Sequence, residues 1–450
     1  MENIRDYIFD SKIASDKVEI ICRKALTEMY GENLPKLISN RLDRELQIIT
    51  ENQYADKYLL AMGIADKNRE LGYMHILGGS GGSSFVAYLM KISNTNPLPP
   101  HYYCPVCKRV EFVDESRCYT GYDLIRDRKV CTVCKNVMTG DGHNIPYENF
   151  LGLDGEKEPY FQFNVAHRIK TNIEKYLQTI FGENKVFYGC YKNTHSKTNS
   201  QTLNRKPGSI FVCPPNINIY DVAEVNNDGY IPTIVSDCNE LSNRFPLKEI
   251  KVLYRDQMVQ IKELEKETGV KAKGVDISEV DIQSFFKNIS IRFLNTFPNP
   301  EFFLSVVFKI KPKTFGEALK LYGFLHGTQV WVDNGEILFD EGHPIDEIIT
   351  FREDVMNYLL QHGMDRKTAY SIMEKARMKK CEVLLTADDE EIMRAYNIPE
   401  WYIDSIKKLV YLFPKAYAVE SGILNLILLW YKEKYPKEFE DVTGQPEIVL

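Results

Sequence analysis

Cys104-Pro-Val-Cys107 places two cysteines three positions apart, and Cys131-Thr-Val-Cys134 repeats the same spacing after residues 108–130. Two such pairs supply four thiolates, which is the donor set of a closed, tetrahedral structural zinc site. A closed site has no open coordination position, so its zinc would hold the fold together and catalyse nothing. The sequence therefore predicts one structural Zn²⁺ bound by Cys104, Cys107, Cys131 and Cys134, and the alternatives are four unrelated buried cysteines or a redox pair.

The composition is that of a folded protein with sizeable cores. The chain has 450 residues, of which 44% are hydrophobic and 26% charged, and its net charge is −7. The length allows about three domains, and the hydrophobic content argues against disorder. Overall acidity does not favour nucleic acid as a partner, but local basic patches decide that question.

The sequence shows neither an export signal nor a membrane span. No basic segment followed by an apolar one opens the chain, and the most apolar stretch, 422–430, is too short to cross a bilayer. Without export, the ten cysteines are expected to be reduced thiols or metal ligands. We therefore expect a cytoplasmic protein that does not bind membranes.

The hydrophobic spacing predicts an α+β fold. Residues 1–30 have a helical pattern, and two more helices are expected between Leu34 and Gly72. A Gly/Ser loop at 76–84 leads into a helical segment that the Pro-rich run 96–100 ends. Runs of β-branched and aromatic residues predict strands at 158–166, 185–191, 209–213 and 247–253. From Val280 onward the pattern is helical.

Several motifs resemble one family. His101-Tyr-Tyr-Cys-Pro-Val-Cys107 with Asn96-Pro-Leu-Pro-Pro100 before it, and Asp141-Gly-His-Asn-Ile-Pro-Tyr-Glu-Asn-Phe-Leu-Gly152 after it, resemble the zinc module of the PolC-type α subunit of bacterial DNA polymerase III. Further similar segments are Gly82-Ser-Ser-Phe-Val-Ala87, Lys311-Pro-Lys-Thr-Phe315, Gly323-Phe-Leu-His-Gly-Thr-Gln-Val-Trp331, Pro399-Glu-Trp-Tyr-Ile-Asp-Ser-Ile-Lys-Lys408 and Phe413-Pro-Lys-Ala416. The resemblance extends from about Leu34 to about Phe439.

The resemblance implies a multidomain α+β protein: a nucleotidyltransferase-like palm with a four-cysteine zinc insertion, and an α-helical fingers domain. The expected divisions are a helical lead-in at 1–33, a first palm part at 34–100, the zinc insertion at 101–150, a strand-rich palm part at 151–275, the fingers at 276–440 and a tail at 441–450. It also implies a bacterial origin and DNA as a partner.

The acidic residues that the family uses are missing. Its members bind two Mg²⁺ ions with three palm aspartates, and the matching positions here are Tyr160, Gln162 and Lys251. Glu249 lies two residues before Lys251 and so on the same strand face, which makes it a possible surrogate ligand. Asp154 and Glu156 are further candidates. Mg²⁺ is expected only if such a surrogate site forms.

Other nucleotide-handling positions have also changed. The phosphate-binding candidates of the Gly/Ser loop are Gly79, Ser80, Gly82, Ser83 and Ser84, although a plain turn is an equally good interpretation. Gly78 stands where the family has an arginine. Glu420 is expected to repel a triphosphate. The segment around 192–206 is shorter than its counterpart.

Basic residues interleaved with aromatic ones suit phosphates and unstacked bases, although each cluster is also compatible with an ordinary solvated surface. The nucleic-acid-binding candidates are Lys251, Lys311, Lys313, Arg377, Lys379, Lys380, Lys407, Lys408 and Lys415. The tail Gln445–Leu450 loosely fits peptides that bind bacterial sliding clamps, and a plain tail is the alternative.

These observations favour a catalytically degenerate homologue that binds DNA or replisome proteins without two-metal nucleotidyl transfer. One alternative is a template-directed DNA polymerase with unusual metal ligands. The other is a protein-interaction module that has also lost DNA binding.

Overall fold

The structure, a computed structural model, describes residues 5–114, 120–195, 200–227, 229–282, 300–377 and 385–444. Its larger sheet is mixed and has the strand order β1-β5-β10-β7-β6-β9-β8. The strands are β1 (Ile76–Gly78), β5 (Gln162–Val165), β6 (Val186–His195), β7 (Ser200–Val212), β8 (Val225–Asn226), β9 (Thr233–Asp237) and β10 (Lys248–Tyr254). A smaller sheet joins β3 (Val110–Phe112), β2 (His101–Tyr103) and β4 (Thr139–Asp141).

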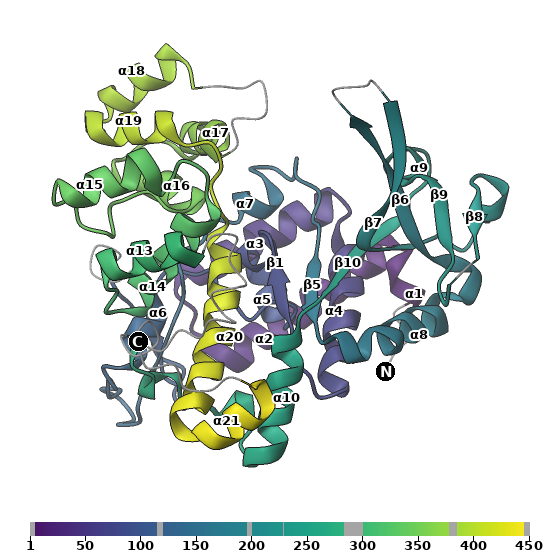
Figure 1. Ribbon diagram of the computed structural model, residues 1–450, viewed down its shortest axis with the longest axis horizontal. Coiled ribbons are helices and arrows are strands. Elements are labelled where there is room, and N and C mark those ends of the chain that lie inside the picture. The colour runs from purple at the N-terminus through teal and green to yellow at the C-terminus, as the bar shows by residue number, and fades with distance from the viewer. Residues whose placement is uncertain are drawn as a thin grey trace.

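Helices lie on both sides of the larger sheet in Figure 1. Those of the sheet half and of the segment with the two cysteine pairs are α1 (Arg5–Ile8), α2 (Ser11–Tyr30), α3 (Lys36–Glu51), α4 (Ala55–Glu70), α5 (Phe85–Leu89), α6 (Gly121–Ile125), α7 (Glu148–Leu151), α8 (Lys170–Phe181), α9 (Cys238–Arg244) and α10 (Asp256–Thr268). A helical lobe contains α13 (Pro300–Ile310), α14 (Phe315–His326), α15 (Glu336–Asp340), α16 (Arg352–Gln361), α17 (Arg366–Arg377), α18 (Ala387–Ala395) and α19 (Glu400–Lys408).

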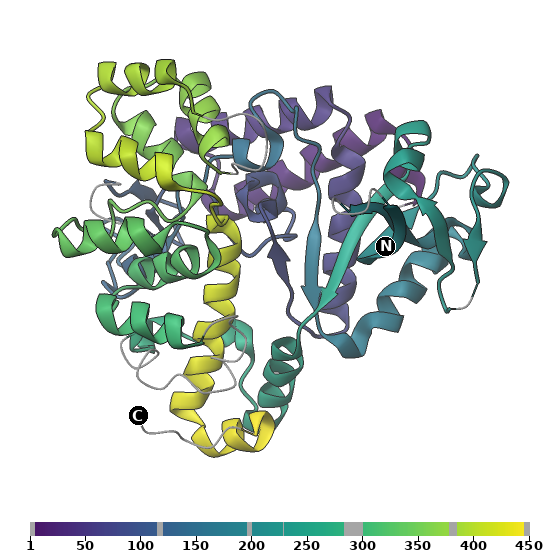
Figure 2. The same ribbon diagram turned by 45° about the horizontal axis from the view of Figure 1, so that its top comes forward.

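The last two helices are α20 (Lys415–Lys434) and α21 (Pro436–Thr443), and α20 runs between the helical lobe and the sheet (Figures 1 and 2). Its Leu424 and Ile427 belong to the core of the sheet half, whereas Val419 and Leu429 belong to the core of the helical lobe. A helix that is apolar on more than one side is buried between two partners. We infer that α20 fixes the two halves against each other.

Alternation along the central strands gives the sheet a buried face. Phe163 of β5 and Ile250 and Val252 of β10 are almost fully buried, and they share a core with residues of α4 and α8. Residues two apart on a strand point to the same side, so Glu249 and Lys251 lie on the opposite face.

The strands expected from the sequence are confirmed, with different limits. β6 and β7 pair from Val186 opposite Val212 to His195 opposite Ser200, which makes a much longer hairpin than expected. β5 starts only at Gln162, so Tyr160 precedes the strand. Pro159 lacks the backbone N–H that a ladder needs, which explains the later start. The two helices expected between Leu34 and Gly72 are α3 and α4.

The expectation that Glu420 faces a nucleotide is wrong. Its side chain is fully buried in α20. The carboxylate accepts hydrogen bonds from Ser93 Oγ at 2.7 Å, Asn94 N at 2.8 Å and Asn94 Nδ2 at 3.0 Å. Burial raises the pKa of Glu420, and the hydrogen bonds from Asn94 and Ser93 oppose that rise. Glu420 therefore connects α20 to the segment that follows α5.

Replacing Glu420 with alanine is predicted to lower the free energy of unfolding by about 2–4 kcal/mol, because the buried Ser93 hydroxyl and the two part-buried donors of Asn94 lose their acceptor. Chemical denaturation monitored by circular dichroism measures this change. Lys437→Ala, at an exposed position of α21, is the control and is expected to change stability by less than about 0.5 kcal/mol. Equal stability of the two variants would contradict a connecting role for Glu420.

Candidate functional site

Two of the residues at the expected aspartate positions, Gln162 and Lys251, lie on one sheet face. β5 and β10 are parallel, with Gln162 opposite Lys251, and β10 and β7 are antiparallel, with Lys251 opposite Ser209. Glu249 lies on this same side of β10. We call Gln162, Ser209, Glu249 and Lys251 the sheet-face site. The strand register thus brings together two of the three positions that the sequence indicated, and Tyr160 is joined to them by a side-chain contact.

Glu249 already has partners in this site. Lys206 Nζ lies 2.9 Å from its carboxylate, and the Tyr160 hydroxyl donates to Oε1 at 3.4 Å. Burial, together with the nearby Glu249 charge, raises the pKa of Tyr160, so the phenol keeps its proton. The possible surrogate ligand is therefore neutralised by a lysine.

Lys251 has no ion pair in the described part of the chain. Its side chain is partly exposed. An unneutralised ammonium group on a partly exposed strand face suits an anion such as a phosphate and opposes a divalent cation.

The pair of Mg²⁺ ions that the resemblance implies does not fit these residues. A metal pair needs several converging carboxylates, and the sheet-face site offers Glu249 alone, held by Lys206. Asp154 is paired with Arg44, and Glu156 accepts the amides of Leu153 and Asp154 at 3.0 Å. Among the residues that the structure describes, three or more metal-binding side chains gather only at the four cysteines.

The Gly/Ser loop is mostly closed to a ligand. Gly82, Ser83 and Ser84 are buried, whereas Gly79 is exposed and Ser80 is partly so. Gly79 has a φ of 67°, a conformation that glycine adopts easily. The phosphate-binding candidates that a ligand can reach are therefore Gly79 and Ser80.

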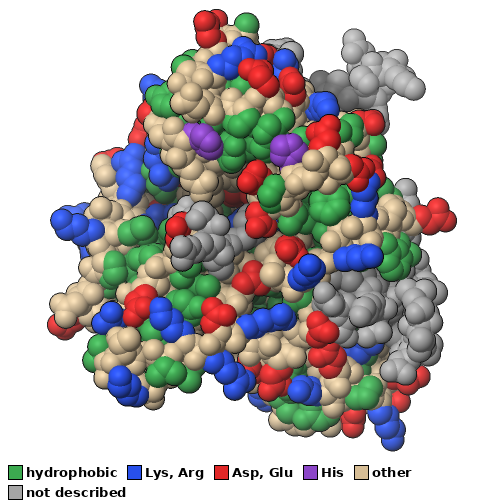
Figure 3. All heavy atoms as spheres, turned by 90° about the vertical axis from the view of Figure 1, so that its left-hand side faces the viewer, with side chains coloured by type: hydrophobic (Ala, Val, Ile, Leu, Met, Phe, Trp, Pro, Cys, Tyr) green, Lys and Arg blue, Asp and Glu red, His purple; other side chains and the backbone are tan. Residues whose placement is uncertain are grey.

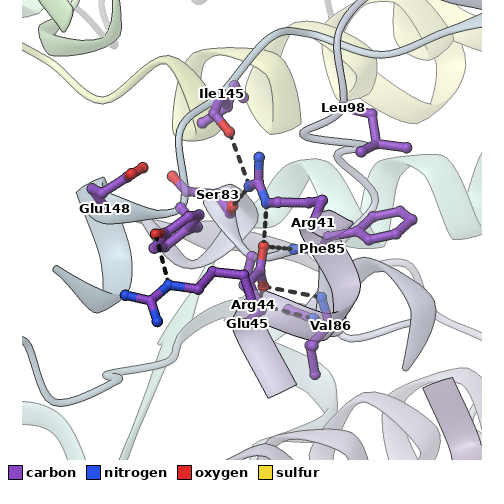
Figure 4. Close-up of polar contacts among 12 residues, drawn as sticks. Arg41, Arg44, Glu45, Ser83, Phe85, Val86, Leu98, Ile145 and Glu148 are labelled. Carbon is purple, nitrogen blue, oxygen red and sulfur yellow. Dashed lines mark hydrogen bonds and ion pairs between the residues drawn. The ribbon is translucent and has the colours of Figure 1, made fainter. Parts of the chain in front are cut away.

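A buried carboxylate occupies the helix start behind this loop. Glu45 accepts hydrogen bonds from Ser84 Oγ at 2.7 Å, Phe85 N at 3.0 Å and Val86 N at 3.2 Å (Figure 4). These amides at the start of α5 would otherwise be free to bind a phosphate. Because Glu45 satisfies them, the helix start is not an anion site.

Gln162 lies against Gly78. A Cβ added at Gly78 would lie 2.3 Å from Gln162 Nε2, so a larger residue at 78 would collide with that amide unless it moved. The present position of the Gln162 side chain therefore depends on a glycine at 78.

The sequence reasoning missed Arg352, at the start of α16. Its Nη1 lies 3.3 Å from Ser80 Oγ, its side chain is almost fully buried, and its Nε has no hydrogen-bond partner. Burial lowers the pKa of Arg352. Only the packing of α16 onto the loop reveals this contact, so no motif could have shown it.

Two more cations accompany Arg352. Lys157 Nζ and Arg377 Nε lie 2.7 Å and 2.8 Å from the carboxylate of Glu374. Burial lowers the pKa of Lys157, and the Glu374 charge opposes that effect. Glu374 therefore neutralises Lys157 and Arg377, and Arg352 is the member of this group that contacts the Gly/Ser loop.

The remaining basic candidates are dispersed. Lys311 and Lys313 are exposed before α14, whereas Lys407 and Lys408 are exposed at the end of α19, and Lys407 pairs with Glu390 at 3.1 Å. Lys415, the first residue of α20, is buried, so it is not on the surface. Lys379, Lys380 and the tail 445–450 lie outside the described residues. Figure 3 shows acidic and basic side chains mixed over the face of the helical lobe, and no single basic track.

The four cysteines converge as the sequence predicts. Their sulfur atoms all lie within 4.8 Å of one another, with Cys104 Sγ 3.3 Å from Cys134 Sγ and Cys107 Sγ 3.5 Å from Cys131 Sγ. This four-sulfur donor set fits a structural zinc ion, which would tie the two cysteine loops together.

Both cysteine pairs form the same backbone turn. Cys104 N donates to Arg109 O and Cys131 N donates to Asn136 O, each at 2.8 Å. Lys108 and Lys135, directly after the second cysteine of each pair, have φ values of 64° and 63°. The repeated turn aims two thiols inward from each loop.

Cys131→Ser is predicted to lower zinc content from about one ion per chain to well below half, and to reduce the melting temperature by several degrees. Elemental analysis and thermal denaturation measure both quantities. Cys213→Ala is the matched control, since Cys213 is buried in a separate apolar cluster and should leave zinc content unchanged. Full zinc occupancy in Cys131→Ser would exclude this ligand set.

No helix within the described ranges is both long and apolar enough to span a bilayer.

Comparison with known proteins identifies relatives of this chain. The family model described as bacterial DNA polymerase III alpha NTPase domain matches residues 16–288. The protein named DNA polymerase III PolC-type from Caldanaerobacter subterraneus subsp. tengcongensis is 32% identical over 476 aligned residues, which cover 95% of this chain and 34% of that protein. The protein of the same name from Clostridium perfringens is 32% identical, with 97% of this chain and 33% of the relative covered.

The corresponding protein of Staphylococcus aureus is 29% identical, over 96% of this chain and 33% of its own length. The chain thus spans about a third of the length of the curated relatives that it matches. The match of the family model and the identity to these relatives show that the chain belongs to the bacterial DNA polymerase III alpha family as a PolC-type homologue.

Proposed function

We propose that this chain is a PolC-type homologue that binds DNA or replisome proteins and does not carry out two-metal nucleotidyl transfer. The observation that carries the proposal is the sheet-face site, where Lys251 lies beside Gln162 and the carboxylate of Glu249 is neutralised by Lys206. A bacterial cytoplasm, where replication takes place, is the setting in which such a protein would act.

Electrostatics opposes metal binding at this site. A unit charge about 4 Å from a divalent cation contributes on the order of 8 kcal/mol at an effective dielectric of about 20. Lys251 turns one such attraction into repulsion, and Gln162 and Tyr160 supply no charge to offset it. A rearrangement of Glu249 toward a metal would also break its ion pair with Lys206.

DNA is the partner that the same site favours. Lys251 has no ion pair in the described residues, and its side chain is partly exposed. A phosphate group of a DNA backbone would bind this ammonium group without a metal ion. This arrangement supports DNA binding over the alternative of a protein-interaction module alone.

The alternative of a polymerase with unusual metal ligands requires carboxylates that converge. Glu249, Asp154 and Glu156 are each engaged by other groups. No described observation favours this alternative over the proposal.

Primer extension tests the proposal. Purified, zinc-loaded protein is expected to add no nucleotide to a primed template with dNTPs and either Mg²⁺ or Mn²⁺, because the sheet-face site holds no metal pair. Products are resolved on a denaturing gel beside an active PolC-type polymerase as the positive control. Metal-dependent extension that Glu249→Ala abolishes would overturn the proposal and establish a rebuilt metal site.

Lys251→Ala is predicted to weaken binding to a primer–template about tenfold and to reduce the slope of log affinity against log salt by about one, because one phosphate contact is lost. Fluorescence anisotropy of labelled DNA at several salt concentrations measures both values. Lys24→Ala, at an exposed position of α2, is the matched control and should bind as the unmodified chain does. Unchanged affinity and salt slope in Lys251→Ala would exclude a phosphate contact at this lysine.

A further inference from the structure

A hollow of about 600 Å³ lies between α3, the segments 98–99 and 144–147, and the helical lobe. Its size is within the range of pockets that hold small molecules. It shares no residue with the sheet-face site. The lining residues are Leu37, Asn40, Arg41, Arg44, Leu98, Pro99, Asn144, Ile145, Pro146, Tyr147, Asn357, Leu360, Gln361 and Arg366.

Three arginines converge on one tyrosine of this wall. The guanidinium carbons of Arg41 and Arg366 lie 5.4 Å and 5.5 Å from the centre of the Tyr147 ring. Arg44 Nε donates to the Tyr147 hydroxyl at 3.3 Å. The charged residues among the lining are arginines alone, so the wall of the hollow is cationic.

The carboxylates that balance two of these arginines lie outside the hollow. Arg41 pairs with Glu45 at 2.5 Å, and Arg366 Nη2 donates to Glu148 at 3.1 Å. Glu45 and Glu148 are both fully buried and neither lines the hollow. These two anions are therefore beneath the wall, whereas Asp154, the partner of Arg44, is exposed to solvent.

Arg41 is held in place but keeps free donors. Its Nη2 donates to the carbonyl oxygens of Ser83 at 2.8 Å and Ile145 at 3.0 Å, while Nε binds Glu45. Its Nη1 takes part in none of the described hydrogen bonds, and Figure 4 shows this nitrogen without a dashed line. Three contacts fix the guanidinium of Arg41 in place, and its Nη1 group is not used by any of them. This group can therefore donate hydrogen bonds to an oxyanion.

The rest of the wall suits a flat organic body. Apolar surface comes from Leu37, Pro99 and Leu360, and side-chain amides come from Asn40, Asn357 and Gln361. Such a mixture of apolar area with a few polar groups is typical of sites for small ligands. We propose that this hollow binds a small, flat organic anion, of nucleoside monophosphate size, whose phosphate is bound by the arginine cluster.

A bound anion would connect the two halves of the molecule. The hollow is formed on one side by α3 and on the other by α16 and α17, where Asn357 Nδ2 already donates to Asn144 O at 2.9 Å. A ligand that contacts both sides stabilises their packing by mass action. The site therefore offers a way for a small metabolite to stabilise the contact between the sheet half and the helical lobe.

Calorimetric titration of the full chain with AMP tests this proposal, with adenosine and inorganic phosphate as separate arms. AMP is expected to bind at least tenfold more tightly than either, because both the arginine cluster and the flat wall contribute. AMP should also raise the melting temperature. Absence of AMP binding at millimolar concentration, or equal affinity for adenosine or for phosphate alone, would overturn the proposal.

Asn40 provides a matched pair of variants. It is exposed, it lines the hollow, and its side chain makes no hydrogen bond in the described part of the chain, so its replacement should not disturb folding. Asn40→Asp adds an anion to the wall and is expected to weaken AMP binding at least tenfold, whereas Asn40→Lys should bind AMP equally or more tightly.

Leu37→Trp, at an exposed position of the wall, should obstruct the hollow and also weaken AMP binding. If both Asn40→Asp and Leu37→Trp show native circular dichroism and bind AMP with unchanged affinity, AMP binds outside the hollow and the proposal is overturned.

Discussion

The register between β5 and β10 is the constraint on which the sheet-face site depends. Their parallel pairing places Gln162 beside Lys251, and the pairing of β10 with β7 places Ser209 beside Lys251 on the neighbouring strand, on the same face of the sheet. Strand alternation then buries Ile250 and Val252 and leaves Glu249 on the face of Lys251. A shift by one residue would exchange the two faces, so the apolar core itself fixes which side chains the site presents.

The packing of the helical lobe against the sheet half is the second feature that determines the surroundings of the Gly/Ser loop. α20 contributes to both cores, and Glu420 anchors it to Ser93 and Asn94. The same packing brings Arg352 of α16 to Ser80 of the Gly/Ser loop. The chemistry near the loop is thus assembled from distant segments, and the orientation of the helical lobe decides which cations the loop meets.

Local patterns in the sequence predict part of this structure well. The cysteine spacing predicts the four-sulfur cluster because each turn is built from adjacent residues, and the central strands follow from apolar runs. Burial cannot be predicted in the same way. Ser83 and Lys415 are enclosed by elements distant in sequence, and Arg352 is recruited by a helix from the other half. Each of these depends on tertiary packing, which no local motif records.

Binding of Mn²⁺ to the sheet-face site tests the central claim most directly, because it does not require the further length that the curated relatives have. Titration followed by electron paramagnetic resonance counts the bound ions. A variant with Tyr160→Asp, Gln162→Asp and Lys251→Asp is the positive control and should gain Mn²⁺ binding. The account predicts no stoichiometric Mn²⁺ site in the unmodified chain. A stoichiometric site that disappears in Glu249→Ala would contradict it.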